Sequence, residues 1–158
     1  MNEATSNGVI AVGIDGSEGS LRALQWAVDE GRLRRCAVEA VTAWPPRGVD
    51  IDLTEEQAAD ARRRADETQR HQLDTVVREG HDTPPLSSEV VRGDAVEVLV
   101  RTSERAQLLV IGSHGTMSMR HAALGSVSEA CATRAACPVV VVPTRPAADA
   151  PHDAVARP

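Results

Sequence analysis

Three glycines and a serine in the second half of the chain have the types and spacing of an anion-binding loop. Two residues separate Gly112 from Gly115, and nine more separate Gly115 from Gly125, which precedes Ser126 and Val127. Glycine lets the backbone approach a ligand closely. Amides at a helix start, with the positive end of its dipole, attract phosphate. The same residues also suit an ordinary strand-to-helix turn, in which Ser126 is only a helix N-cap.

The segments on either side of these glycines would position them at the end of a buried strand. Residues 108–111 are four consecutive apolar residues, which is typical of a strand buried on both faces. Ser126 with Glu129 matches a capping box that has the serine at the N-cap, so a helix is predicted over 126–136. The predicted order is therefore strand, glycine-containing loop and helix.

A second candidate residue lies near the start of the chain. Residues 9–14 form another apolar run, and Asp15 follows at its carboxyl end, where ligands bind in open α/β sheets. Asp15 could accept hydrogen bonds from a ribose or a base, or help to hold a metal. The alternative is a turn aspartate that bonds its own backbone. Residues 36–43 read as the next strand, so Val41 would lie beside Asp15 if the two strands are neighbours. Trp44 could then stack on a base or simply pack.

The spacing Gly-x2-Gly-x9-Gly-Ser resembles the nucleotide-binding signature of the universal stress protein family, in its ATP-binding branch. The segment VGIDGS, which contains Asp15, resembles the opening motif of that family, and VRGDAVEVL and CPVVVVP are also similar to it. The resemblance covers residues 9–143, and no internal repeat is visible.

This resemblance implies ATP as the ligand, with a divalent ion such as Mg²⁺ on its phosphates as a further possibility. It implies that Asp15 contacts the nucleoside and that the backbone of Val41 contacts adenine. Residues 116–124 are poorer in glycine than many loops of the family. Within them, Arg120 could reach a phosphate as a charged clamp, or be an ordinary surface arginine.

The remaining segments predict an α/β fold, a five-stranded parallel doubly wound (Rossmann-like) sheet with helices on both faces. Helices are predicted from Ser17, from Thr54 to about Glu79 with a Thr54–Gln57 capping box, and from Asp94. Residues 86–91 read as an edge strand and 139–142 as the last strand. The domain spans 9–143, with a flexible N-terminus over 1–8 and a disordered Pro- and Ala-rich tail over 144–158.

Composition excludes several classes of function. The chain has 158 residues, a net charge of −6, two Trp and no Phe or Tyr, which argues against nucleic-acid binding. All 17 basic residues are arginine, so a Walker A lysine is excluded. Three cysteines without a C-x-x-C pair indicate a reduced, cytoplasmic setting. No signal peptide and no membrane-length apolar run is apparent.

Catalytic patterns are also missing from the sequence. The five histidines lack metal-ligand spacing, and no serine lies in Gly-x-Ser-x-Gly. A regulatory binding protein is therefore expected, in which ATP occupancy sets the conformation or the partners of a stress-response protein. The alternatives are a slow ATPase and a nucleotide-free interaction scaffold. The apolar strand Val139–Val142 lacks charged gatekeepers and predicts a homodimer through that edge, which the resemblance also implies.

Overall fold

The computed structural model describes residues 8–45, 52–80, 82–115 and 124–144. Arg120, the N-terminal residues 1–7 and the tail from 145 lie outside the described residues. Strands and helices alternate along the chain. They are β1 (Val9–Gly13), α1 (Glu18–Arg34), β2 (Ala37–Trp44), α2 (Glu55–Glu79), β3 (Leu86–Arg92), α3 (Ala95–Ser103), β4 (Leu108–Gly112), α4 (Ser126–Arg134) and β5 (Val139–Val142).

The strands form one parallel sheet in the order β3-β2-β1-β4-β5, which confirms the predicted fold class. β1 lies in the centre because its residues are fully apolar and can be buried on both faces. Gly13 is paired with Val41 on β2, and Val12 with Val110 on β4. The chain therefore proceeds outward from β1 on one side and later returns to its other side, which creates a switch point between β1 and β4.

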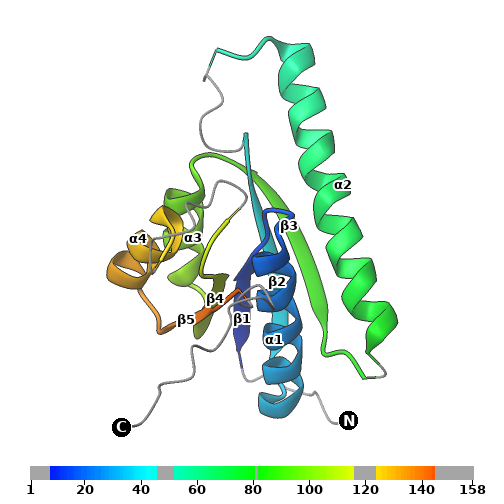
Figure 1. Ribbon diagram of the computed structural model, residues 1–158, viewed down its shortest axis with the longest axis vertical. Helices are drawn as coiled ribbons and strands as arrows, with labels where there is room; N and C mark the ends of the chain where they lie inside the picture. Colours follow the sequence, from blue (N-terminus) through cyan, green and yellow to red (C-terminus); the bar gives the residue numbers. More distant parts are fainter. Residues whose placement is uncertain (1–7, 46–51, 81, 116–123, 145–158) are drawn as a thin grey trace, which may run out of the picture.

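Helices cover both faces of the sheet (Figure 1). α1 and α2 lie on one face, where the core is built from alternate strand residues such as Ile10, Val12 and Val38 together with Leu24. α3 and α4 lie on the other, where Leu109 packs with residues such as Leu99 and Cys131. Because successive side chains of a strand point to opposite faces of the sheet, the same short apolar runs supply the core on both faces.

Three of the predicted helix starts are confirmed. Ser17 is the N-cap of α1, and its hydroxyl oxygen accepts the Ser20 amide at 3.1 Å. The Thr54 side chain accepts the Gln57 amide, and the Gln57 side chain accepts the Thr54 amide, which completes the capping box of α2. The Asp94 side chain accepts the amides of Val96 and Glu97 at the start of α3. These bonds satisfy backbone donors that have no partner within the helix.

The predicted capping box of α4 is wrong. Gly125, in an extended conformation, is the N-cap, and Ser126 is already the first helical residue. The amide of Glu129 donates to the Gly125 carbonyl at 2.9 Å, so the helical bonding begins one residue earlier than predicted. Among the residues that the structure describes, no side-chain hydrogen bond caps this helix start. Glycine is itself an accepted N-cap residue, so the serine beside it gave a misleading signal.

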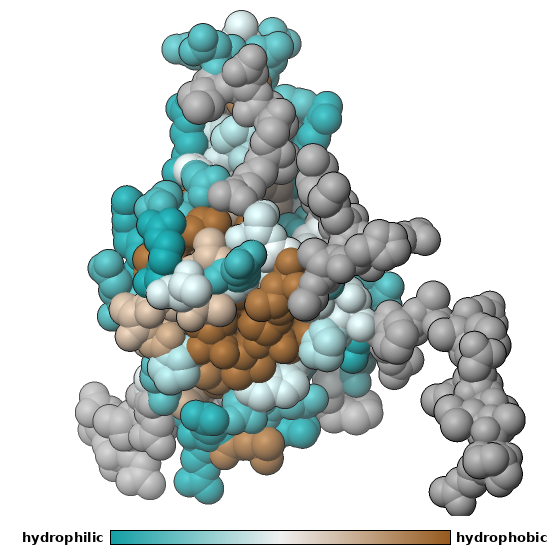
Figure 2. All heavy atoms as spheres, turned by 60° about the vertical axis from the view of Figure 1, so that its left-hand side comes forward, coloured by the Kyte–Doolittle hydropathy of each residue, from teal (hydrophilic) through white to brown (hydrophobic). Residues whose placement is uncertain are grey.

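The two edges of the sheet differ in character. β3 has two serines, a glutamate and an arginine, and most of its residues are exposed, as predicted for an edge strand. β5 consists of four valines, of which Val139, Val140 and Val141 are half-buried. Figure 2 shows an apolar patch on the face of the molecule that includes β5. In the described part of the chain, none of the helices has the length and hydropathy needed to cross a bilayer.

Candidate functional site

The loop after β1 and the loop after β4 touch at the carboxyl edge of the sheet. Asp15 follows β1 and is exposed, and Gly115 follows β4 and is also exposed. A Cβ atom added to Gly115 would lie 2.6 Å from Asp15 Oδ2. The structure therefore brings together the two residues that the sequence singled out separately, and it does so beside the switch point between β1 and β4.

The Asp15 carboxylate is oriented by the residue two positions further on. Its Oδ1 accepts the Ser17 amide at 2.9 Å and the Ser17 hydroxyl at 2.5 Å. Asp15 thus bonds its own backbone, as the turn alternative required, and also lies against the glycine loop. Gly16 between them has φ +85°, a conformation that favours glycine. Ser17 was predicted only as a helix start, although an Asp-x-Ser sequence is a signal for this turn.

Gly112 has a structural reason to be glycine. A Cβ there would lie 2.7 Å from the carbonyl carbon of Gly19 in the first turn of α1. A Cβ on Gly19 would in turn lie 2.7 Å from the His114 carbonyl oxygen. The two backbones therefore approach each other without room for a side chain, and this contact places the start of α1 against the end of β4. Sequence reasoning did not identify Gly19.

Gly125 is held to the start of the loop by backbone bonds. Its amide donates to the Ser113 carbonyl at 2.7 Å. The Ser128 hydroxyl, which is buried, lies 2.9 Å from that same carbonyl oxygen and 2.9 Å from the Gly125 carbonyl. The N-terminus of α4 is therefore fixed near the end of β4. Ser126 is exposed there, and Val127 packs partly against the core beside α3.

Val41 lies on the strand next to β1, as predicted. Its side chain is buried, and its carbonyl accepts the Ile14 amide at 2.8 Å. A carbonyl oxygen has a second lone pair, which an amino group of a base could use. Trp44 is buried, and the Arg92 guanidinium lies 5.5 Å from its ring centroid. This environment favours packing over base stacking for Trp44.

Ser113 connects the loop to the segment that follows β5. Its hydroxyl oxygen lies 3.1 Å from His114 Nδ1 and accepts the Thr144 amide at 3.2 Å. Its amide donates to the Val142 carbonyl at 2.8 Å. Among the described residues, no three His, Cys, Asp or Glu side chains gather in a way that could hold a metal ion. The described site consists of one carboxylate, one histidine, backbone groups and hydroxyls.

The sheet order, the switch point and the glycine loop before a helix N-terminus define an α/β protein of the doubly wound class. The universal stress protein family model matches residues 7–143. The chain belongs to the universal stress protein family.

Relatives in the family extend beyond the length of this chain. The chain is 32% identical over 143 residues to universal stress protein Rv2624c of Mycobacterium tuberculosis, a match that covers 89% of this chain and 51% of the relative. A second relative, Mb2028c of Mycobacterium bovis, is 34% identical over 134 residues, covering 84% of this chain and 44% of that protein. The chain therefore spans about half the length of these curated relatives.

Solved structures share the fold. UspA from Lactobacillus plantarum superposes with a TM-score of 0.68 at 20% identity, over 87% of this chain and 99% of that one. A universal stress protein in complex with cAMP gives 0.58 at 24% identity, over 89% and 100%. An Arabidopsis thaliana family member with AMP bound gives 0.55 at 19% identity, over 92% and 97%.

Proposed function

We propose that this chain binds an adenine nucleotide, with ATP as the physiological ligand, and that occupancy regulates its conformation or its partners. The observation that supports this best is the contact between Gly115 and Asp15. It joins a glycine loop suited to phosphate with a carboxylate suited to a nucleoside, at the edge where such sheets bind ligands. Similar folds hold cAMP and AMP, which supports the nucleotide class.

In this proposal, each part of the site meets one part of the ligand. Asp15 accepts hydrogen bonds from the ribose, and the Val41 backbone meets the adenine. The phosphates lie over the glycine loop and the start of α4, where the helix dipole favours negative charge. The residues proposed for the phosphates are Gly112, Gly115, Arg120, Gly125, Ser126 and Val127. Any Mg²⁺ would be held mainly by phosphate oxygens and water, because Mg²⁺ needs few protein carboxylates.

The proposal also covers the oligomeric state and the cellular compartment of the protein. We propose a cytoplasmic homodimer that pairs through β5, because a four-valine edge strand with half-buried side chains invites pairing. The apolar patch in Figure 2 supports this. A dimer would also place two nucleotide sites in one assembly, so that occupancy could alter partner binding.

The test is calorimetric titration of ATP with Mg²⁺ into the wild type and Gly115→Val. The side chain of a valine at this position would meet the Asp15 carboxylate, which would have to move. It would also reduce the space for a ligand beside Gly115. Gly80→Ala is the matched control, since Gly80 is exposed at the end of α2 with an ordinary φ of −103°.

We expect ATP binding by the wild type and Gly80→Ala, and its loss in Gly115→Val, with all three folded by circular dichroism. Binding that is unchanged in Gly115→Val would contradict the placement of the site. Failure of the wild type to bind any adenine nucleotide would leave an interaction scaffold as the better description. Phosphate release by the bound protein would measure any ATPase activity.

A further inference from the structure

α2 presents amide side chains to the sheet. The residues of α2 that are buried are Gln69, Gln72 and Val76. A helix that covers a sheet ordinarily buries an aliphatic stripe, and a buried amide without partners costs free energy. Gln69 is 1% exposed and Gln72 is 5% exposed, yet no buried side-chain nitrogen or oxygen in the described residues lacks a hydrogen bond. Both buried amides are therefore hydrogen-bonded, and their partners show which part of the fold each amide holds in place.

Gln72 is bonded to the turn that holds Asp15. Its Nε2 donates to the Ser17 carbonyl at 2.8 Å. Its Oε1 accepts the Ser20 hydroxyl, also at 2.8 Å. Because Ser17 donates both its amide and its hydroxyl to Asp15, a continuous series of hydrogen bonds runs from Gln72 through Ser17 to the Asp15 carboxylate.

A second contact fixes the same turn from the same helix. A Cβ on Gly16 would lie 2.6 Å from Thr68 Cγ2, so Thr68 of α2 covers this glycine directly. The Asp15 side chain of the same turn meets Gly115. The turn thus contacts both α2 and the glycine loop, and its position depends on α2.

We propose that Gln72 is a positioning residue for nucleotide binding. It sets the Asp15 turn from behind, so that the carboxylate lies beside Gly115 before the ligand arrives. Such preorganisation raises affinity because the exposed carboxylate need not be ordered on binding. This inference rests on the proposed nucleotide-binding function, and it assigns to α2 a part in the site that the sequence motifs do not contain.

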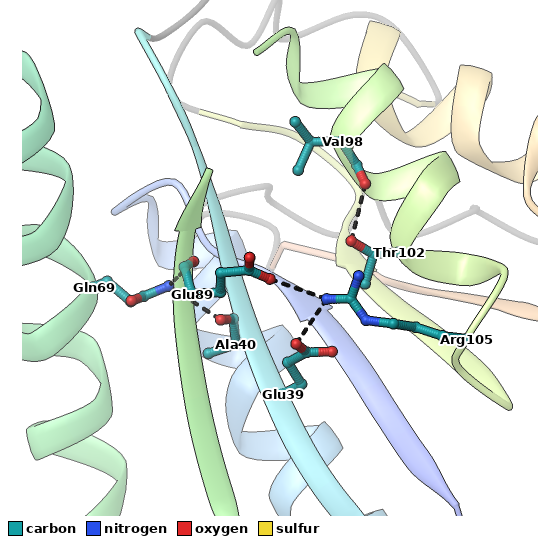
Figure 3. Close-up of polar contacts among 7 residues, drawn as sticks. All are labelled: Glu39, Ala40, Gln69, Glu89, Val98, Thr102 and Arg105. Carbon is teal, nitrogen blue, oxygen red and sulfur yellow. Dashed lines mark hydrogen bonds and ion pairs between the residues drawn. The ribbon is translucent and has the colours of Figure 1, made fainter. Parts of the chain in front are cut away.

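Gln69 provides a matched comparison one turn earlier in the same helix. Its Nε2 donates to the carbonyls of Ala40 at 3.2 Å and Glu89 at 3.0 Å (Figure 3). It also donates to the Thr42 hydroxyl at 3.0 Å. Gln69 is therefore a buried amide of equal size whose hydrogen bonds go to β2 and β3 and not to the Asp15 turn. Its loss should not act through Asp15.

The experiment is a double-mutant cycle on ATP affinity, measured by calorimetry. Gln72→Met, a near-isosteric change without the amide, is combined with Asp15→Ala, and Gln69→Met is combined with Asp15→Ala in parallel. We expect Gln72→Met to weaken ATP binding roughly tenfold in the wild-type background, within the range of couplings between connected residues. It should have no effect once Asp15 is removed. Any effect of Gln69→Met should be the same with and without Asp15.

Equal weakening by Gln72→Met in both backgrounds would overturn the proposal, since it would show a general structural effect. Unchanged ATP affinity in Gln72→Met would overturn it as well, while leaving nucleotide binding intact. A wild type that binds no nucleotide would overturn the proposed function and this role with it. Ser20→Ala is a second variant in case Gln72→Met folds poorly. It removes one anchor of Gln72, alanine is well tolerated in helices, and it should weaken binding several-fold only when Asp15 is present.

Discussion

Gly112 and Gly115 have different neighbours, which indicates a role in folding for the first and in ligand binding for the second. Gly112 meets the backbone of Gly19, which cannot move without shifting α1. Gly115 meets the end of the Asp15 side chain, which can rotate away. At the residue scale, the family signature therefore combines a glycine required for packing with a glycine that borders the proposed ligand.

We predict that Gly112→Ala destabilises the protein by about 1–3 kcal/mol, as an overpacked contact does. Gly115→Ala should change the free energy of unfolding by far less, because only the Asp15 carboxylate has to turn. Urea denaturation of both variants measures the difference. Equal destabilisation by the two substitutions would show that the close backbone contact with Gly19 does not determine the cost of a side chain at Gly112.

Cys137 gives a prediction that depends on its pKa. Burial raises the pKa of this half-buried thiol above its ordinary value. Less thiolate is then present at neutral pH, so alkylation should be slow and should accelerate as the pH is raised toward that pKa. The rate of iodoacetamide labelling against pH, compared with a short cysteine peptide, measures this. Labelling of Cys137 at neutral pH as fast as that of the peptide would contradict the prediction. Cys36 and Cys131 are buried and should label only on unfolding.

At the scale of elements, the helix caps of α2 and α3 differ in what they stabilise. α3 packs into the core, with Val98 and Leu99 buried, whereas the buried residues of α2 all lie in its C-terminal half. Figure 1 shows the N-terminal end of α2 extending beyond the sheet. Loss of a cap on α3 should therefore affect global unfolding, and loss of a cap on α2 should affect local fraying.

We predict that Asp94→Ala lowers the free energy of unfolding by about 1 kcal/mol. Thr54→Ala, which removes the capping box of α2, should leave the urea midpoint nearly unchanged and speed amide hydrogen exchange in residues 55–60. Both variants remove one capping side chain, so each is the control for the other. A similar shift in midpoint for both would show that the outer half of α2 unfolds with the core.

The sequence predicted the structure well where a run of apolar residues alone is enough to identify a buried strand. Runs such as residues 108–111 and 139–142 predicted their strands because β-branched and aliphatic side chains suit a doubly covered sheet. The inner face of α2 was not predictable in this way. Several alanines, Leu73 and Val76 recur along this helix, yet of these only Val76 is buried, and Gln69 and Gln72 are buried with it. Their burial depends on carbonyls and hydroxyls supplied by β2, β3 and the Asp15 turn, which hydropathy does not encode.

The candidate site was predictable in its residues and not in its geometry. The spacing of glycines identified Gly115, and the position of Asp15 at the end of an apolar run identified that residue, but only the fold shows that they touch. The start of α4 at Gly125 was missed because Ser126 and Glu129 satisfy the capping pattern one residue too late. Ser17 was recognised as a cap and not as the partner that orients Asp15. In each of these cases, a contact with another part of the fold determines the backbone position, and the local sequence does not contain that contact.

At the scale of the whole molecule, backbone direction in β5 shows how a dimer would form. The carbonyls of Pro138 and Val142 accept amides of Leu109 and Ser113, in and just after β4. Because successive backbone groups in a strand alternate in direction, the N–H and C=O groups of Val139 and Val141 face away from β4. These are the groups that a second copy of the strand would use.

We predict that Val141→Pro makes the protein monomeric while it stays folded. Proline removes the outward N–H and obstructs strand pairing, and it is tolerated at positions of an edge strand whose N–H is not used within the sheet. Val141→Ala keeps the N–H with a comparably small side chain, so it should remain dimeric. Sedimentation equilibrium at micromolar concentration, with circular dichroism of each variant, measures both properties. A wild type that sediments as a monomer would remove β5 as a pairing edge. A dimeric Val141→Pro would place the interface on side chains elsewhere, since an interface built on the β5 backbone cannot survive the loss of its central donor.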